Sequence, residues 1–114
     1  MNIETYVDQL GLRVIKEEEE LESIKKGILH IYASWSGPSR LQTRLFLELI
    51  DELNLSHECI YFLDNDLIRS KSNIERLNNQ GHGETLLIEE GFPVFRSQFG
   101  ISKREFSQRL SSFF

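Results

Sequence analysis

The strongest constraint on the fold is a buried strand that leads through a short turn directly into an amphipathic helix. Residues 28–34, ILHIYAS, are mostly apolar, β-branched or aromatic, which is typical of a strand covered on both faces. The turn sequence SGPS follows at residues 36–39, and apolar side chains then recur at spacings of three and four from Leu41 to Leu53. This pattern predicts a helix over residues 38–54. A strand followed at once by a long helix favours a parallel crossover.

Two more segments predict strands. Residues 58–64, ECIYFLD, are a second apolar run, with Cys59 in the strand. Residues 84–98 contain two apolar runs that turn around Gly91, so they predict an antiparallel hairpin. Pro93 lies in the second run. Because proline cannot donate to a strand ladder, we expect that strand at a sheet edge or at a bulge.

The intervals between these strands show helix patterns. Ser102 and Glu105 form a capping box that predicts the start of a C-terminal helix, and Ile101 and Phe106 stand at the positions of a hydrophobic staple. The order of elements predicts one α/β domain over residues 1–114, with a mixed central sheet, flanking helices, a closing β-hairpin and a C-terminal helix. The other expected elements are a short helix ending at Gly11, a short strand over 12–15, a helix over 18–26 that ends at Gly27, and a helix over 66–79.

The charge balance argues against a nucleic-acid-binding function. The chain has 13 basic and 18 acidic residues, a net charge of −5, whereas nucleic-acid binders carry a basic excess or a basic stripe. No apolar stretch approaches the ~20 residues that span a bilayer, and the start of the sequence lacks the basic-then-apolar order of a secretory signal. We therefore expect a cytoplasmic protein that binds neither nucleic acid nor a membrane. The acidic run at residues 17–20 fits a solvated helix start, or a patch that steers a basic partner.

The supply of thiols and imidazoles argues against disulfides, metals and cofactors. Cys59 is the one cysteine, so no intramolecular disulfide can form. His30, His57 and His82 are far apart in the sequence and give no zinc-ligand spacing. Inside an apolar strand, we expect the Cys59 thiol to be buried and unreactive.

The Trp-x-Gly-Pro-x turn, set between a buried strand and a long helix, resembles the active-site turn of the thioredoxin family. Three further segments match in order: ECIYFLDND, ETLLIEEG and FGISKREFSQRL. The resemblance implies a thioredoxin-like α/β sandwich and places Ser36 and Ser39 at the nucleophilic and resolving cysteine positions. A serine hydroxyl does not ionise near neutral pH and forms no disulfide. The resemblance therefore implies a redox-inactive member of this fold.

Two other parts of the redox apparatus also differ from the family pattern. The place of the family's cis-proline reads Gly83-Glu84-Thr85. Because a cis bond before a non-proline residue costs ~3 kcal/mol, we predict a trans peptide there. The buried acid of the family lies five residues before the tryptophan, where this chain has His30, which we expect to be a hydrogen-bonded core histidine.

By this resemblance we predict a non-catalytic protein-binding module that uses the surface of the former active site. An immunity protein that inhibits a basic toxin and an adaptor in an assembly both fit. For Trp35, contact with the partner and packing within the domain are equally compatible with the sequence. The turn could also bind an anion, which Arg40 would favour and Glu84 would oppose. The predicted surface consists of Trp35, Ser36, Gly37, Pro38, Ser39, Arg40, Gly83, Glu84 and Thr85.

Two alternatives remain open from the sequence. The first is a degenerate enzyme with residual chemistry through Ser36, Ser39 or Cys59, including hydrolysis if His30 activates Ser39. The second is a degenerate domain without a specific ligand, in which replacement of Trp35 changes stability alone.

Overall fold

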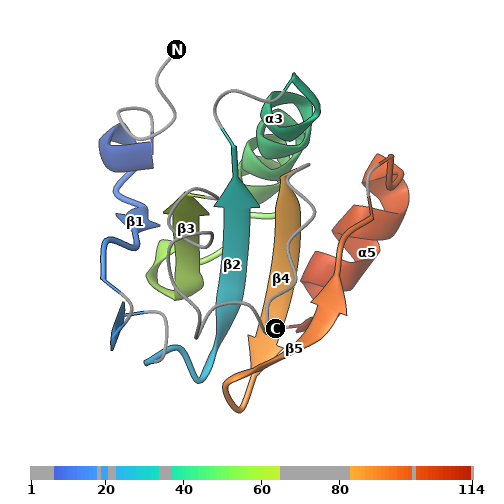
Figure 1. The fold of residues 1–114 in the computed structure, drawn as a ribbon. Helices are drawn as coiled ribbons and strands as arrows, with labels where there is room; N and C mark the ends of the chain where they lie inside the picture. Colours follow the sequence, from blue (N-terminus) through green and yellow to red (C-terminus); the bar gives the residue numbers. More distant parts are fainter. Residues whose placement is uncertain are drawn as a thin grey trace.

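The strand predicted at residues 28–34 lies at the centre of the sheet. Strand β2 (Lys26–Tyr32) pairs in parallel with β3 (Ile60–Asp64) on one side and antiparallel with β4 (Glu84–Glu89) on the other. With β1 (Arg13–Val14) and β5 (Phe92–Arg96) at its edges, the sheet has the order β1-β3-β2-β4-β5, with parallel and antiparallel neighbours (Figure 1). The prediction of a mixed sheet is therefore confirmed.

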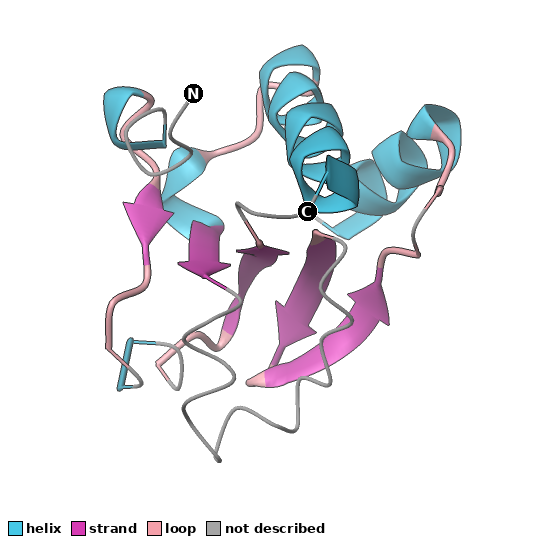
Figure 2. Ribbon diagram, turned by 45° about the horizontal axis from the view of Figure 1, so that its top comes forward, coloured by secondary structure: helices cyan, strands magenta, loops and turns pink. Residues whose placement is uncertain are grey.

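The computed structural model describes residues 7–17, 19–20, 23–33, 37–64, 83–98 and 100–113. Helices α3 (Gly37–Glu52) and α5 (Lys103–Phe113) both pack on one face of the sheet (Figure 2). None of the helices within these ranges is long and apolar enough to cross a membrane. The described residues also include the 3-10 turn η1 (His57–Cys59).

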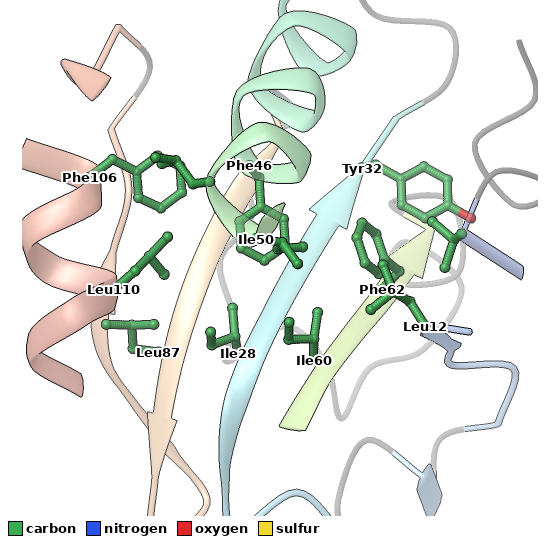
Figure 3. Packing of buried hydrophobic residues seen from close by; sticks show 12 residues of the cluster. Leu12, Ile28, Tyr32, Phe46, Ile50, Ile60, Phe62, Leu87, Phe106 and Leu110 are labelled. Atoms are coloured by element: carbon green, nitrogen blue, oxygen red, sulfur yellow. The ribbon is translucent and has the colours of Figure 1, made fainter. Parts of the chain in front are cut away.

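Alternation along β2 buries side chains on both faces of the sheet. Ile28 and Tyr32 join the core under α3 and α5, while Leu29 and Ile31 join a second cluster. Successive side chains of a strand point to opposite faces, so a continuous apolar run is what a two-sided core requires. Figure 3 shows the core under the helices, in which residues of α3 and α5 meet those of three strands: Phe46, Ile50, Phe106 and Leu110 against Ile28, Ile60, Phe62 and Leu87.

The two long helices begin and face the core as their sequences predict. In α3 the buried positions recur at spacings of three and four, with Phe46, Leu49 and Ile50 in the core. Ser102 accepts a hydrogen bond from the Glu105 amide at 3.1 Å, which confirms the N-cap of α5.

The closing hairpin has a tight turn and accommodates a proline in its second strand. Glu90 and Gly91 have φ values of 54° and 83°, the pair of left-handed residues that a tight hairpin turn requires. Pro93 lies in β5, which is an edge strand, and the β4–β5 register shifts between Leu87 and Ile88. The edge position and the irregular register therefore both accommodate the residue that cannot donate to the ladder.

Two of the expected boundaries are wrong. Gly27 does not end a helix but lies within β2, opposite Ile88. Cys59 lies in the 3-10 turn before β3 rather than inside the strand, because β3 begins at Ile60. The helix expected over 66–79 lies outside the described residues.

Gly27→Ala should destabilise the fold by about 1–3 kcal/mol, the usual cost of overpacking. A Cβ atom at residue 27 would lie 2.9 Å from the Cys59 carbonyl oxygen, which belongs to the backbone and cannot move aside. Urea unfolding would measure the change. The matched control is Gly37→Ala, where the added methyl group has room and we expect no loss. Equal effects of the two substitutions would contradict this view of β2.

Candidate functional site

The loop before β4 packs against the first turn of α3. Gly83 directly precedes β4 and has a φ of 83°, a conformation that favours glycine. A Cβ atom at this position would lie 2.9 Å from the Ser39 carbonyl oxygen and 3.0 Å from Gln42 Cβ. Only a residue without a side chain lets the two backbones approach this closely. The structure thus brings Gly83 and Ser39, two residues of the predicted surface, into contact.

Ser39 joins the start of α3 to the end of β2. The residue has no exposed area, and its Oγ accepts a hydrogen bond from the Ala33 amide at 2.7 Å. A hydroxyl that is buried and accepts from the backbone fixes the geometry of the turn. In this position Ser39 is a structural residue.

His30 connects three elements beneath the turn. Its Nδ1 lies 2.8 Å from Thr85 Oγ1 in β4, and its Nε2 lies 2.7 Å from Thr43 Oγ1 in α3. The ring also stacks on Phe46, with the centroids 4.9 Å apart. Complete burial lowers the pKa of His30 to about 3, so the ring is neutral at physiological pH. The expectation of a hydrogen-bonded core histidine is confirmed.

The geometry does not assemble a serine–histidine pair. Both nitrogens of His30 are engaged by threonine hydroxyls, while Ser39 Oγ is bonded to Ala33. Thr43 is 2% exposed and Thr85 is fully buried, so neither hydroxyl can reach a substrate in this arrangement. The hydrolytic alternative therefore has no support in the structure.

An ion pair occupies the start of β4. Arg96 in β5 donates to the carboxylate of Glu84, whose side chain has no exposed area, while a quarter of the Arg96 side chain is exposed. Burial lowers the pKa of the Arg96 guanidinium, although an arginine keeps its charge in proteins. Because Arg96 compensates the carboxylate, Glu84 does not present a repulsive charge to an anion at the turn.

The backbone around Glu84 is also fixed by hydrogen bonds. The described residues contain no cis peptide, so the Gly83–Glu84 bond is trans, as predicted. The Thr85 amide donates to Ser97 Oγ at 2.9 Å, and the Ser97 amide donates to the Thr85 carbonyl at 3.0 Å. The end of β5 thus holds the beginning of β4.

Burial divides the predicted surface into an exposed part and a supporting part. Pro38 and Arg40 are exposed, and Gly37 is half-buried. The four other described residues of the predicted surface are buried, because β4 begins in the interior and Ser39 faces the end of β2. Ser39, Gly83, Glu84 and Thr85 support the surface from beneath, and Trp35 and Ser36 lie outside the described residues.

The sequence reasoning missed three members of the supporting network, namely Thr43, Arg96 and Ser97. Thr43 was detectable, since it is a polar residue at an inward-facing position of a helix, one turn after Ser39. Arg96 and Ser97 carried no such signal, because their partners depend on the bulged register of the hairpin.

The single thiol lies far from the turn. Cys59 is beside Gly27 at the start of β2, and the turn follows the other end of that strand, roughly 20 Å away for seven residues. The thiol is half-buried and donates to the Ser56 carbonyl at 3.2 Å. Burial raises its pKa, which disfavours the reactive thiolate. The prediction of a buried thiol is wrong, because Cys59 is half-buried.

The described residues contain no cluster of three or more histidine, cysteine or acidic side chains that could hold a metal ion.

Comparison with solved structures identifies the fold. The reduced thioredoxin pre-protein of Schistosoma mansoni has a TM-score of 0.69 and 21% identity, over 90% of this chain and 98% of that chain. Malassezia sympodialis thioredoxin has a TM-score of 0.68 and 14% identity, over 90% of each chain. The chain has the thioredoxin fold. Chloroplastic thioredoxin z is also similar, with a TM-score of 0.63 and 20% identity over 90% and 93% of the two chains. No protein-family model and no curated protein sequence matches the chain.

The thioredoxin fold gives the His30 network its position at the end of the central strand, under the first turn of the helix that follows. Three kinds of polar contact hold this junction together. Threonine hydroxyls contact the His30 imidazole, the Ser39 hydroxyl accepts from a backbone amide, and the Glu84 carboxylate pairs with a guanidinium. Each is satisfied within the protein. The arrangement stabilises a defined surface shape and leaves no activated nucleophile among these groups.

His30→Gln should remove a pH dependence of stability. Because the pKa of His30 is about 3 in the folded state against 6.5 unperturbed, the unfolded chain binds a proton between these values that the folded chain excludes. The stabilisation is fully present above pH 6.5 and decreases as the pH falls, by at most about 1.4 kcal/mol per pH unit.

Free energies of unfolding in urea at pH 7, 6 and 5 would measure this slope. Wild type and His57→Gln, a substitution at an exposed histidine, should share the steeper slope. His30→Gln should have a slope smaller by about one proton. An unchanged slope in His30→Gln would show that residue 30 is not excluded from protonation.

Arg96→Met should destabilise the fold by about 3 kcal/mol. The substitution leaves the buried Glu84 carboxylate without its partner, and the expected loss is at the low end for buried pairs because Arg96 is partly exposed. Adding Glu84→Gln should recover part of the loss. Arg104→Met, at an exposed position of α5, is the matched control and should change the stability little. Thermal and urea unfolding would measure the stability of wild type, the two methionine variants and the double variant. Equal stability of the two methionine variants would contradict the role of the ion pair.

Proposed function

We propose that this chain is a non-catalytic protein-binding module of thioredoxin fold, whose contact surface lies around the turn between β2 and α3. The observation that carries the proposal is the use of Ser39: the oxygen at the place of the resolving cysteine is buried and bonded to the Ala33 amide. The only thiol is at the opposite end of the central strand. Dithiol exchange at the turn therefore has no sulfur atoms to act on.

The surface above this network has the properties of a contact site. Pro38 and Arg40 are exposed at the start of α3, and Leu41 beside them is 61% exposed. Leu41 offers an apolar contact beside a helix start that the buried Ser39–Ala33 hydrogen bond holds in place. Trp35, next to the turn in sequence, would add an aromatic anchor to this surface.

In this proposal the chain is a stoichiometric inhibitor such as an immunity protein, or an adaptor in a larger assembly, and acts in the cytoplasm. The net charge of −5 favours a partner with a basic overall charge. Neither role needs a cofactor.

Leu41→Ser should abolish or weaken the capture of a partner. The tagged chain would be passed through a lysate of its native host, with retained proteins quantified by mass spectrometry. The matched control is Phe92→Ser, which removes an equally exposed apolar side chain from β5: Phe92 is 67% exposed. We expect one protein retained stoichiometrically by wild type and Phe92→Ser, with at least about tenfold less on Leu41→Ser. A partner lost from Phe92→Ser instead would move the surface to β5, and no retained protein would contradict the proposal.

Reduction of insulin disulfides by dithiothreitol should not be accelerated by the chain. Wild type and Cys59→Ser should both match the rate without protein, because the Cys59 thiol is half-buried, has a raised pKa and lacks a second cysteine. Any acceleration that Cys59→Ser abolishes would overturn the non-catalytic proposal in favour of monothiol chemistry.

A further inference from the structure

The charges of α3 are arranged against its own helix dipole. The first turn contains Arg40 and no acidic residue, and the last turn contains no basic residue. A helix is stabilised by acids near its N-terminus and bases near its C-terminus, so this helix has the unfavourable order. Arg44 follows Arg40 at a spacing of four, where like charges repel.

The acidic residues near the C-terminus of α3 have an ion-pair partner, whereas Arg44 has none among the described residues. At the acidic end, Lys103 of α5 binds Glu52 at 2.6 Å and lies 3.7 Å from Glu48. In the second turn of α3, Arg44 is exposed and makes no ion pair within the part of the chain that the structure describes. A chain with net charge −5 thus has a concentrated positive region where the helix dipole is also positive.

An apolar side chain lies within this positive region. Leu41 is 61% exposed, and it is three residues from both Pro38 and Arg44, so the three are neighbours on the helix surface. A ligand that satisfies this region has to combine negative charge with an apolar group.

Gln42 provides an independent indication of a ligand. The residue is 8% exposed, yet among the described residues its side-chain amide has no hydrogen-bond partner. Helical side chains lean toward the N-terminus of their helix, so Gln42 is directed to the first turn of α3, beside Gly83. Buried amides without partners are rare in folded proteins, so the Gln42 amide has capacity to bond to a group from outside the chain.

We infer that Pro38, Arg40, Leu41, Gln42 and Arg44, here called the α3 basic surface, bind an acidic peptide segment with an apolar side chain, presented by a partner protein. This inference deepens the proposed function and depends on it. A carboxylate of the segment pairs with Arg44, and a second one lies at the helix N-terminus. Its apolar side chain packs on Leu41, and one of its peptide groups bonds to the Gln42 amide, which can donate and accept.

The bound segment has the opposite charge to the partner that the net charge of the chain favours. The acidic composition of the whole chain favours a basic partner, but the charge of this surface is the opposite of the net charge. The Glu84 carboxylate beneath the turn does not oppose an anion, because it is paired with Arg96. A partner with a basic overall charge can still insert an acidic segment here.

The test is selection from a phage-displayed library of random twelve-residue peptides against the folded full-length chain. We expect the retained peptides to be enriched in Asp and Glu around a large apolar residue. Arg44→Glu should weaken the binding of a selected peptide by at least about tenfold. Arg104→Glu, the same charge change at an exposed position of α5, should leave it unchanged.

Gln42→Leu separates binding from folding. The substitution keeps a similar volume and removes the buried amide, so we expect an equal or higher melting temperature together with a severalfold loss of affinity for the selected peptide. Unchanged affinity would overturn the role of Gln42.

The outcomes distinguish this inference from the proposed function. Peptides that are basic or uncharged, lose affinity with Leu41→Ser and ignore Arg44→Glu would overturn the acidic segment while preserving a binding surface at the turn. Peptides insensitive to every substitution in the α3 basic surface, or no retained peptides, would overturn the proposed function as well.

Discussion

Two hydrogen bonds made by one buried histidine hold the junction of β2, α3 and β4 together. His30 is in the central strand, and its ring nitrogens contact hydroxyls of α3 and β4 at 2.7 and 2.8 Å. The helix start and the strand start on either side of it therefore keep a fixed separation. That separation allows the backbones at Gly83 and Ser39 to pack closely. Because the ring is buried against Phe46 and stays neutral, the junction brings no charge into the core.

The network explains how a thioredoxin fold can keep its shape without its dithiol. By the family resemblance, the two cysteine positions, the cis-proline and the buried acid are all replaced here, and each replacement in the described residues makes a contact within the domain. The serine bonds to a strand amide, the glycine packs on a helix, and the histidine bonds to two threonines. What such a site can offer is a stable surface. In our proposal the exposed residues at the start of α3 use that surface to bind a protein.

The sequence was sufficient for the fold because its signals are local and mutually consistent. The apolar run of β2, the periodicity of α3 and the Ser102 cap each predicted an element that the structure contains. It failed where a residue's environment depends on neighbours distant in sequence. Gly27 signalled a helix end, but close contact with Cys59 requires glycine in a strand. Glu84 was predicted to lie on the surface, but it is buried in an ion pair with Arg96. The irregular register of the hairpin brings Arg96 beside it, and the local sequence does not reveal that register.

The most direct test of this account is hydrogen exchange at two amides that donate to buried serine hydroxyls, those of Ala33 and Thr85. If the network holds the turn, both amides should exchange as slowly as those in the middle of β2, through global unfolding alone. Exchange of Ala33 and Thr85 that is orders of magnitude faster, while the middle of β2 stays protected, would contradict it. The turn would then open locally, and the buried polar contacts would not be what defines the surface.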